Sequence, residues 1–289
     1  MNGSLVSIVV PAFNRAGVIT ETLESIARQT YREIECIVVD DGSADSTVAV
    51  VEEWGRQHAQ FNLLLIRLER NAGKCAAVNR GLREAAGEFI MVLDSDDILM
   101  PETIDSEVDY LDRHREVGMV FGKAYLMEAG RKGSQIIGCF ADEGEFNDLI
   151  ERNGDLVLNG NAIIASTVLI RASVVYDVGE WRTDLKYIHD WDYWVRVAGK
   201  FKIGFLGRPV LYYRTNLHGS ISSDRVGMFK ETFRWLMEPS KSLGRKALYR
   251  VLFYQTKYFL WLSYHQGEPL DMMRIALHGL RVATGVVLG

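Results

Sequence analysis

Three closely spaced carboxylates are the residues in this chain with the clearest chemical potential. The stretch "FIMVLDSDDILMP" runs from five mostly apolar residues directly into Asp94, Asp96 and Asp97. Clustered carboxylates repel one another and resist burial, so they need either a cation among them or free solvation. Their oxygens suit Mg²⁺ or Mn²⁺, which carboxylates commonly hold together with substrate phosphates. The alternative is an acidic turn before a helix, where Asp is favourable in any case.

Two further polar stretches could bind an anionic ligand. "DDGS" (Asp40–Ser43) is ordinary turn chemistry, but its carboxylates could also accept hydrogen bonds from a base or a sugar. "RNAGKCAAVN" lacks the phosphate-loop spacing, because Leu68 and Cys75 stand where that pattern needs Gly and Ser or Thr. Lys74 in this stretch could still supply a cation, and a basic helix start on the surface is equally compatible.

Two later stretches contain candidates for proton transfer and diphosphate binding. In "HDWDYW", Asp190 lies among aromatic residues that could tune a general base. Taken alone, that stretch fits an amphipathic helix start better, with Asp190 as its cap. In "YYRTNLHGSIS", Arg214 and His218 could grip a diphosphate, and His218 could also be a metal ligand. A lone histidine in a loop is more often simply solvated.

Alternating strands and helices must position these residues. Apolar strand-like runs at 5–10, 34–39, 62–68 and 89–93 alternate with segments of helical periodicity, which predicts an α/β fold with a mostly parallel sheet covered by helices. Ligands of such sheets bind outside the carboxyl ends of the strands. The polar stretches follow those ends, so we expect one convergent site. Beyond residue 115, "VGMVFG" and "STVLIR" predict further strands, and Asp142–Gly160 a loop or short helix over the site.

Composition and charge exclude several classes of protein. The formal net charge of −5 argues against a general nucleic-acid binder, which needs a basic surface. Three cysteines, Cys36, Cys75 and Cys139, are widely spaced and typical of reduced thiols. The first residues do not resemble a signal peptide, and no apolar run reaches the length of a membrane span. We therefore expect a cytoplasmic protein.

The last part of the chain is the least informative. From about Asp224 onward the sequence predicts only helices, so we divide the chain into a catalytic domain, 1–223, and a C-terminal helical segment, 224–289. The preferred interpretation is a helical appendage packed on the catalytic domain. Homodimerisation through these helices comes second. The third is peripheral contact of an amphipathic helix with the inner face of the membrane.

Taken together, the motifs resemble a known family. The order "VPAFNR", "DDGS", "RNAGKCAAVNRG", "GEFIMVLDSDD", "HDWDYWVR" and "YRTNLHGSIS" is similar to the family 2 glycosyltransferases of GT-A fold, over roughly residues 5 to 222. The resemblance implies transfer of a sugar from a nucleotide-diphosphate sugar, commonly a UDP-sugar, to an acceptor hydroxyl, with inversion at the anomeric carbon. It further implies a divalent metal, Mn²⁺ or Mg²⁺, and a glycan or lipid-linked acceptor in cell-surface or exopolysaccharide synthesis.

The resemblance also assigns roles to single residues. Asp96 matches the metal ligand of the DxD motif, with His218 as a second candidate ligand, and Asp94 matches the aspartate near the ribose. Asp41 matches the aspartate that reads the base, and Asp190 matches the catalytic base. Arg214 and His218 fall on the mobile loop that covers the diphosphate. The remaining residues expected at the nucleotide are Pro11, Phe13, Asn14, Arg15, Lys74 and Ser95.

Two departures from the family pattern and three alternatives remain. His189 stands where many members have Glu, and Phe13 replaces a frequent Tyr; neither change removes a residue of the expected mechanism. An aspartyl-phosphate phosphatase would need "DSDDI" after the first strand, and here it follows the fourth. A sugar nucleotidyltransferase normally needs a glycine-rich basic loop after the first strand. A degenerate sugar-nucleotide-binding or assembly protein is disfavoured by the presence of Asp96, Asp190 and His218.

Overall fold

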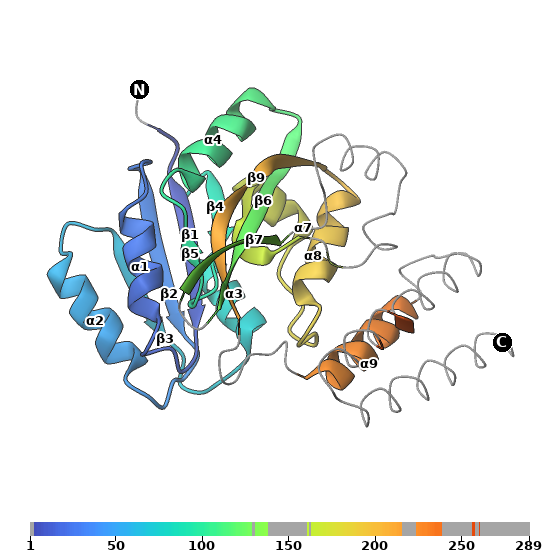
Figure 1. Cartoon of the computed structure of the whole chain (residues 1–289), viewed down its shortest axis with the longest axis horizontal. Coiled ribbons are helices and arrows are strands. Elements are labelled where there is room, and N and C mark those ends of the chain that lie inside the picture. Colours follow the sequence, from blue (N-terminus) through green and yellow to red (C-terminus); the bar gives the residue numbers. More distant parts are fainter. Residues whose placement is uncertain are drawn as a thin grey trace, which may run out of the picture.

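The structure is a computed structural model with one large mixed sheet between helices (Figure 1). It describes residues 3–128, 131–137, 161, 163–215, 224–238, 256–257 and 260. The strand order is β3-β2-β1-β4-β8-β6-β9-β5, and β7 pairs with β6. The expected loop at Asp142–Gly160 and the predicted site residue His218 lie outside the described residues.

The first half of the sheet is parallel, as the sequence predicts. β1 (Val6–Ala12) pairs in parallel with β2 (Ile34–Asp40) and with β4 (Phe89–Val92), and β2 pairs in parallel with β3 (Leu63–Arg67). Val6 is in register with both Ile34 and Phe89. Because these strands point the same way, the polar residues that follow them meet at one edge of the sheet.

The second half of the sheet is mixed. β8 (Val168–Arg171) runs antiparallel between β4 and β6 (Val117–Glu128), and β6 is parallel to β9 (Lys202–Thr215). The strands predicted from "VGMVFG" and "STVLIR" are therefore confirmed as β6 and β8. Two short elements complete this half: β5 (Ile98–Leu99) pairs with β9, and β7 (Arg131–Ile137) pairs with β6.

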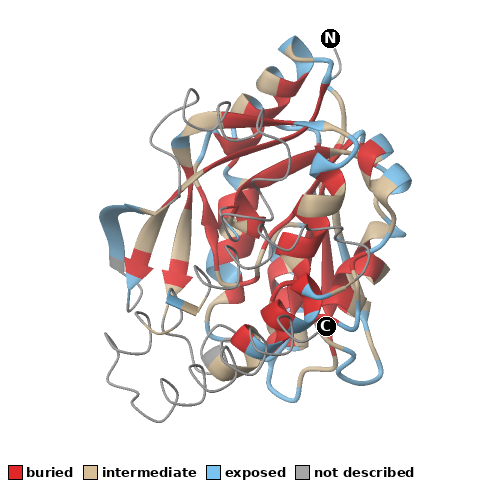
Figure 2. Cartoon of the chain, turned by 90° about the vertical axis from the view of Figure 1, so that its right-hand side faces the viewer, coloured by how far each residue is buried: buried red, intermediate tan, exposed pale blue. Residues whose placement is uncertain are grey.

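Helices cover both faces of the sheet, which is buried between them (Figure 2). Alternate residues of β4 enter opposite cores: Phe89 and Met91 face one, whereas Ile90 and Val92 face the other. This alternation follows from the two-residue period of a strand. α1 (Ile19–Ala27), α2 (Thr47–Gln57) and α4 (Thr103–Arg113) pack on the first face, and α3 (Lys74–Leu82), α7 (Ala172–Val178) and α8 (His189–Ala198) on the second.

One further helix, α9 (Arg225–Leu236), packs beside α8. An aromatic cluster joins them, in which the ring centroids of Trp191 and Trp235 lie 4.8 Å apart. The described part of the segment after residue 223 thus shares a core with α8, while the division of the chain at that residue stays a prediction. No helix in the described ranges combines the length and apolarity that a membrane crossing requires.

Candidate active site

The carboxyl ends of β1 and β4 and the start of α3 bring four predicted residues together. Lys74, the first residue of α3, holds its Nζ 2.5 Å from Oδ1 of Asp94. Arg15, in the loop after β1, places its Nε 3.5 Å from Oδ2 of Asp96. Both ion pairs are partly shielded, because all four side chains are 20–28% exposed. The convergence expected from the sequence is present for these residues.

The charges at this point are unevenly balanced. Burial raises the pKa of Asp96, the neighbouring Asp94 raises it further, and Arg15 and Lys74 lower it only in part. For Lys74, burial lowers the pKa of the ammonium, but the carboxylates of Asp94, Asp190 and Asp96 outweigh that effect and the net shift is upward. The carboxylate of Asp190, in α8, thus contributes to the field at Lys74 together with the strand-end carboxylates.

The donor set is compatible with a divalent cation. Added positive charge would offset the effect of Asp94 on the pKa of Asp96, and carboxylate oxygens are the ligands that Mg²⁺ and Mn²⁺ prefer. Within the described ranges, no group of three or more His, Cys, Asp or Glu side chains forms a ready-made metal site. The predicted ligand His218 lies outside those ranges, so the residues present supply only part of a coordination shell.

Asp97, the third aspartate of "DSDD", stabilises the acidic turn from its buried side. Asp97 is fully buried, and its Oδ1 accepts a hydrogen bond from the backbone N–H of Arg214 (3.0 Å). Arg214 in turn donates from Nε to the carbonyl oxygen of Asp96 (2.8 Å), and its Nη2 lies 3.1 Å from Glu21. The Arg214 side chain is 5% exposed. Its described contacts therefore hold the acidic turn against β9, and its predicted contact with a diphosphate stays a prediction.

The loop after β1 is fastened to the loop after β2. Asn14 has a positive φ of 54°, a conformation that Asn tolerates better than most residues. Its Oδ1 accepts a hydrogen bond from the Ala44 N–H (2.9 Å), and its own N–H donates to Oγ of Ser43 (2.9 Å). Pro11 and Ser95 are buried, whereas Phe13 is 40% exposed. Of these predicted residues, Phe13 therefore presents a free aromatic surface.

Asp41 fastens the loop after β2 to the loop before α3. Its two carboxylate oxygens accept hydrogen bonds from the N–H groups of Ala72 (2.7 Å) and Gly73 (2.9 Å). Burial raises the pKa of Asp41, and these two bonds lower it in part. The adjacent Gly42 has a φ of +71°, and a Cβ there would lie 2.7 Å from the backbone of Arg70. Asp41 thus has a structural role beside the base-reading role predicted for it.

The predicted general base lies in the first turn of α8. Oδ2 of Asp190 accepts a hydrogen bond from Nδ2 of Asn161 (2.8 Å), and Oδ1 accepts one from the N–H of Trp191 (2.8 Å). These two hydrogen bonds orient the carboxylate at the start of the helix. For the neighbouring His189, burial lowers the pKa, as does the charge of Lys74, and both outweigh the opposing effect of Asp190. His189 is therefore neutral at pH 7.

A second acidic residue of α8 serves the helix packing. Asp192 is buried, and it accepts hydrogen bonds from Nε1 of Trp235 (2.7 Å) and Nε of Arg196 (2.9 Å). Arg182 lies 3.7 Å from Asp192 and bonds to Glu238 at 2.8 Å. This network ties α8 to α9 and gives Asp192 a role distinct from that of Asp190.

Sequence reasoning missed the residues that support the site. Asn161 bonds Asp190, Ser166 accepts the Asp94 N–H (3.1 Å), and Glu21 pairs with Arg214. None of the three belongs to a motif, and each meets its partner only through tertiary folding. The sequence located site residues by the polar stretches that follow predicted strands. Asn161, Ser166 and Glu21 do not lie in those stretches, so the sequence could not identify them.

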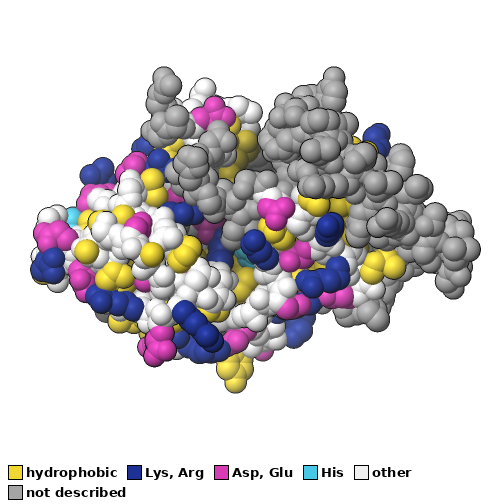
Figure 3. All heavy atoms as spheres, turned by 90° about the horizontal axis from the view of Figure 1, so that it is seen from below, with side chains coloured by type: hydrophobic (Ala, Val, Ile, Leu, Met, Phe, Trp, Pro, Cys, Tyr) yellow, Lys and Arg dark blue, Asp and Glu magenta, His cyan; other side chains and the backbone are white. Residues whose placement is uncertain are grey.

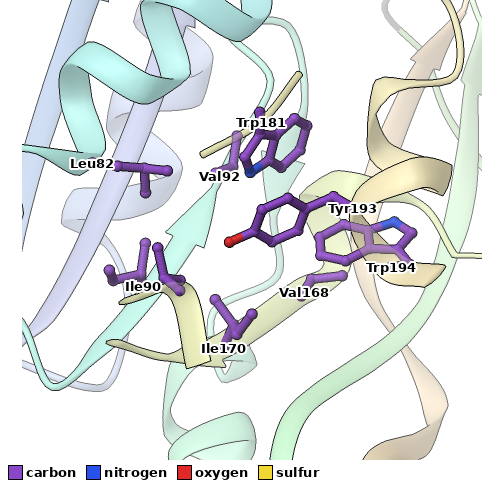
Figure 4. A pocket seen from close by; sticks show the side chains of 9 residues that line it. Leu82, Ile90, Val92, Val168, Ile170, Trp181, Tyr193 and Trp194 are labelled. Carbon is purple, nitrogen blue, oxygen red and sulfur yellow. The ribbon is translucent and has the colours of Figure 1, made fainter. Parts of the chain in front are cut away.

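A separate small cavity lies under α8 and is not part of this site (Figure 4). It has a volume of about 10 Å³, room for at most one water molecule. Its lining is apolar apart from Tyr193, whose hydroxyl has no hydrogen-bond partner among the described residues. The cavity is a packing feature.

The molecular surface seen from below in Figure 3 shows basic and acidic side chains interspersed among the described residues.

The mixed α/β sheet, with an acidic turn and a lysine at its strand ends, agrees with the nucleotide-sugar transferase fold expected from the sequence. The sequence profile described as "Glycosyl transferase family 2" matches residues 7–176. Because that match covers more than half of the chain, the protein belongs to glycosyltransferase family 2.

Relatives and solved structures agree with this assignment. A Staphylococcus epidermidis poly-beta-1,6-N-acetyl-D-glucosamine synthase is 24% identical over 89% of this chain and 62% of its own length, so the chain spans less than two thirds of that relative. An uncharacterized glycosyltransferase of Haemophilus influenzae is 30% identical over 77% of this chain and 68% of its own length.

The structural likeness shows the fold. Staphylococcus aureus TarS (residues 1–349), solved with UDP-GlcNAc, has a TM-score of 0.69 at 20% identity, covering 96% of this chain and 81% of that one. A Pyrobaculum calidifontis mannosyltransferase, solved with GDP-Man and Mn²⁺, has a TM-score of 0.64 at 19% identity, covering 99% of this chain and 76% of that one. The GT-A fold predicted from the sequence is confirmed.

Proposed function

We propose that this protein is an inverting glycosyltransferase that moves a sugar from a UDP-sugar to an acceptor hydroxyl, with Asp190 as general base. The observation that carries the proposal is the gathering of Lys74, Asp94 and Asp96 at the strand ends, with the Asp190 carboxylate of α8 close enough to Lys74 to raise the pKa of that ammonium. The UDP-GlcNAc in TarS supports a uridine donor.

The chain's own residues divide the chemistry between them. Lys74 and Arg15 would offset the negative charge of a diphosphate, and exposed Phe13 would lie against the nucleotide. Asp41 would contact the base, and Arg214 with His218 would close over the diphosphate. Asp190, oriented by Asn161, would accept the proton of the acceptor hydroxyl as its oxygen attacks the anomeric carbon. A single displacement of this kind inverts the configuration there.

A divalent cation, Mn²⁺ or Mg²⁺, belongs to this proposal. Asp96 and His218 would hold it, with Asp94 near the ribose. When bound, such a cation neutralises the charge that develops on the diphosphate leaving group. The raised pKa of Asp96, caused by burial and by Asp94, supports a need for added positive charge. The Mn²⁺ in the archaeal mannosyltransferase is consistent with it.

The biological setting is proposed from the relatives. The synthase of S. epidermidis is named for a polysaccharide of N-acetylglucosamine, which supports a role in cell-surface or exopolysaccharide synthesis with a glycan or lipid-linked acceptor. We place the reaction in the cytoplasm, with peripheral contact at the inner face of the membrane as a further proposal. That contact, or a homodimer, would involve the segment after residue 224.

Nucleotide binding and turnover test the proposal separately. Calorimetry with UDP, GDP and CDP, each with and without Mn²⁺, should show metal-dependent binding of UDP that Asp96→Ala abolishes. Asp190→Asn should keep UDP binding but lower release of UDP from UDP-GlcNAc about 10²–10⁴-fold, the usual contribution of general base catalysis. Asp105→Asn, an exposed change on α4, is the control. Binding without turnover of any donor would favour a degenerate binding protein, and no binding would contradict the proposal.

A further inference from the structure

The Glu231 side chain on α9 binds the backbone of the turn that precedes α8. Its carboxylate accepts hydrogen bonds from three consecutive backbone N–H groups: Lys186 (2.9 and 3.0 Å to its two oxygens), Tyr187 (2.6 Å) and Ile188 (3.1 Å). Consecutive backbone N–H groups of this kind form a concave anion-binding site. Glu231 is only 9% exposed, so water competes little for these donors. The contact therefore fixes the backbone of residues 186–188.

This turn is the immediate support of the predicted base. Ile188 is the N-cap residue of α8, and Asp190 lies in the first turn of that helix. A displacement of the turn would move the Asp190 carboxylate directly, because only one residue separates them. The described hydrogen bonds of the Asp190 side chain, from Asn161 and Trp191, hold its rotamer but do not anchor the start of the helix.

α9 is itself held firmly enough to act as an anchor. Asp224 caps its first turn by accepting from the Gly227 N–H (2.9 Å) and also bonds the Tyr187 hydroxyl. Arg234 donates to the carbonyl oxygen of Asp184 (3.1 Å). The buried aromatic residues of α9 pack against Leu185, Ile188 and Trp191. The helix thus meets the segment before α8 at several points, with Glu231 at the centre.

We infer that Glu231 is a positioning residue for Asp190, so that α9 completes the active centre rather than merely covering it. The inference rests on the proposed function. Glu231 does not contact the nucleotide-side residues in any described interaction, so its effect should fall on proton transfer and not on donor binding. Displacements of about 1 Å in a reacting geometry can cost on the order of 100-fold in rate.

The test compares two isosteric changes on the C-terminal side of the fold. Glu231→Gln removes the carboxylate that receives the three N–H groups. Glu180→Gln makes the same chemical change at an exposed position after α7, where the partner is Arg83. For each, UDP release from UDP-GlcNAc with Mn²⁺ gives kcat and KM, with water as acceptor. Calorimetry gives UDP affinity, and hydrogen exchange reports the amides of residues 185–191.

We expect Glu231→Gln to lower kcat about 10- to 100-fold, with KM and UDP affinity unchanged, and to accelerate amide exchange at 185–191. Glu231→Asp should fall between it and the wild type, and it replaces the Gln variant if that fails to fold. Glu180→Gln should match the wild type in all readouts. A normal kcat, unchanged exchange, or a rise in KM alone would overturn the inference. A wild-type protein without turnover would contradict the proposed function instead, and exchange would still decide whether Glu231 holds the turn.

Discussion

The two sides of the candidate site are built in different ways. On the nucleotide side, the turns after β1, β2 and β3 are joined by short polar contacts such as Asn14 with Ala44 and Asp41 with Gly73. On the base side, Asp190 sits on a helix whose start is gripped by Glu231, some forty residues later in the chain. Parallel strands place their following turns together automatically, whereas a helix reaches the site only if other elements hold it there.

A large loss of UDP affinity is expected when the Lys74 ammonium is removed from the nucleotide side. Lys74→Met deletes the ammonium beside Asp94 and should weaken UDP binding about 10- to 100-fold, because hydrogen bonds to charged groups contribute roughly 1.5–3 kcal/mol. Calorimetry with Mn²⁺ measures the change.

The matched control for this cation is Lys200→Met. That lysine lies just after the C-terminal end of α8 and donates to the carbonyl oxygen of Asp177 in α7, so its loss should leave UDP affinity unaltered. Equal affinity of Lys74→Met and the wild type would remove Lys74 from the nucleotide side.

A smaller effect is expected from loosening the nucleotide side without changing its shape. Asp41→Asn leaves one amide NH₂ facing a backbone N–H of Ala72 or Gly73, so the free energy of unfolding should fall by about 1–3 kcal/mol. Urea denaturation measures it, with the exposed Asp105→Asn as reference.

The same variant also sharpens the comparison between the two sides. Amide exchange at residues 185–191 should stay at the wild-type rate, because the contacts of that turn do not include Asp41. Faster exchange there would mean that the contacts of Asp41 also stabilise the turn before α8.

The smallest expected effect lies outside both sides, at Glu107 of α4. This carboxyl is fully buried, and its oxygens have no hydrogen-bond partner among the described residues. Burial raises the pKa of Glu107 well above its usual range, and the charge of Arg208 lowers it only in part. The folded protein therefore keeps this proton over a pH range in which the unfolded chain releases it.

That difference gives the wild type a stability that falls as pH rises. Below the ordinary pKa of Glu, about 4.3, both states are protonated and Glu107→Gln should change little. Above that pH the unfolded wild-type chain releases the Glu107 proton, which lowers the stability of the wild type but not that of Glu107→Gln. The Tm of Glu107→Gln relative to the wild type should therefore rise by a few degrees from pH 5 to pH 8, as measured by thermal unfolding. Exposed Glu102→Gln should show no such trend. A difference that is constant across pH would contradict the assignment.

The sequence predicts the nucleotide side of the site better than the base side. The apolar runs and the polar residues after them predicted β1 to β4 and the meeting of Lys74, Asp94 and Asp96, because a strand's direction fixes where its end lies. The same logic could not find Asn161 or Glu231, which bind through loop geometry and through backbone N–H groups that carry no sequence signal. Nor could it show that Asp97 faces inward, since all three aspartates of "DSDD" look alike until the turn is folded.

The antiparallel insertion of β8 also has a consequence for synthesis of the chain. In the finished sheet β4 lies between β1 and β8, yet Val168, which begins β8, follows Val92 by 76 residues. At ribosomal rates of roughly 5–20 residues per second, β4 waits roughly 4–15 seconds for its second neighbour. During that time its four apolar residues form an open sheet edge, which is a template for pairing with other chains. We therefore expect the nascent chain to be most prone to aggregation before residue 171 has emerged.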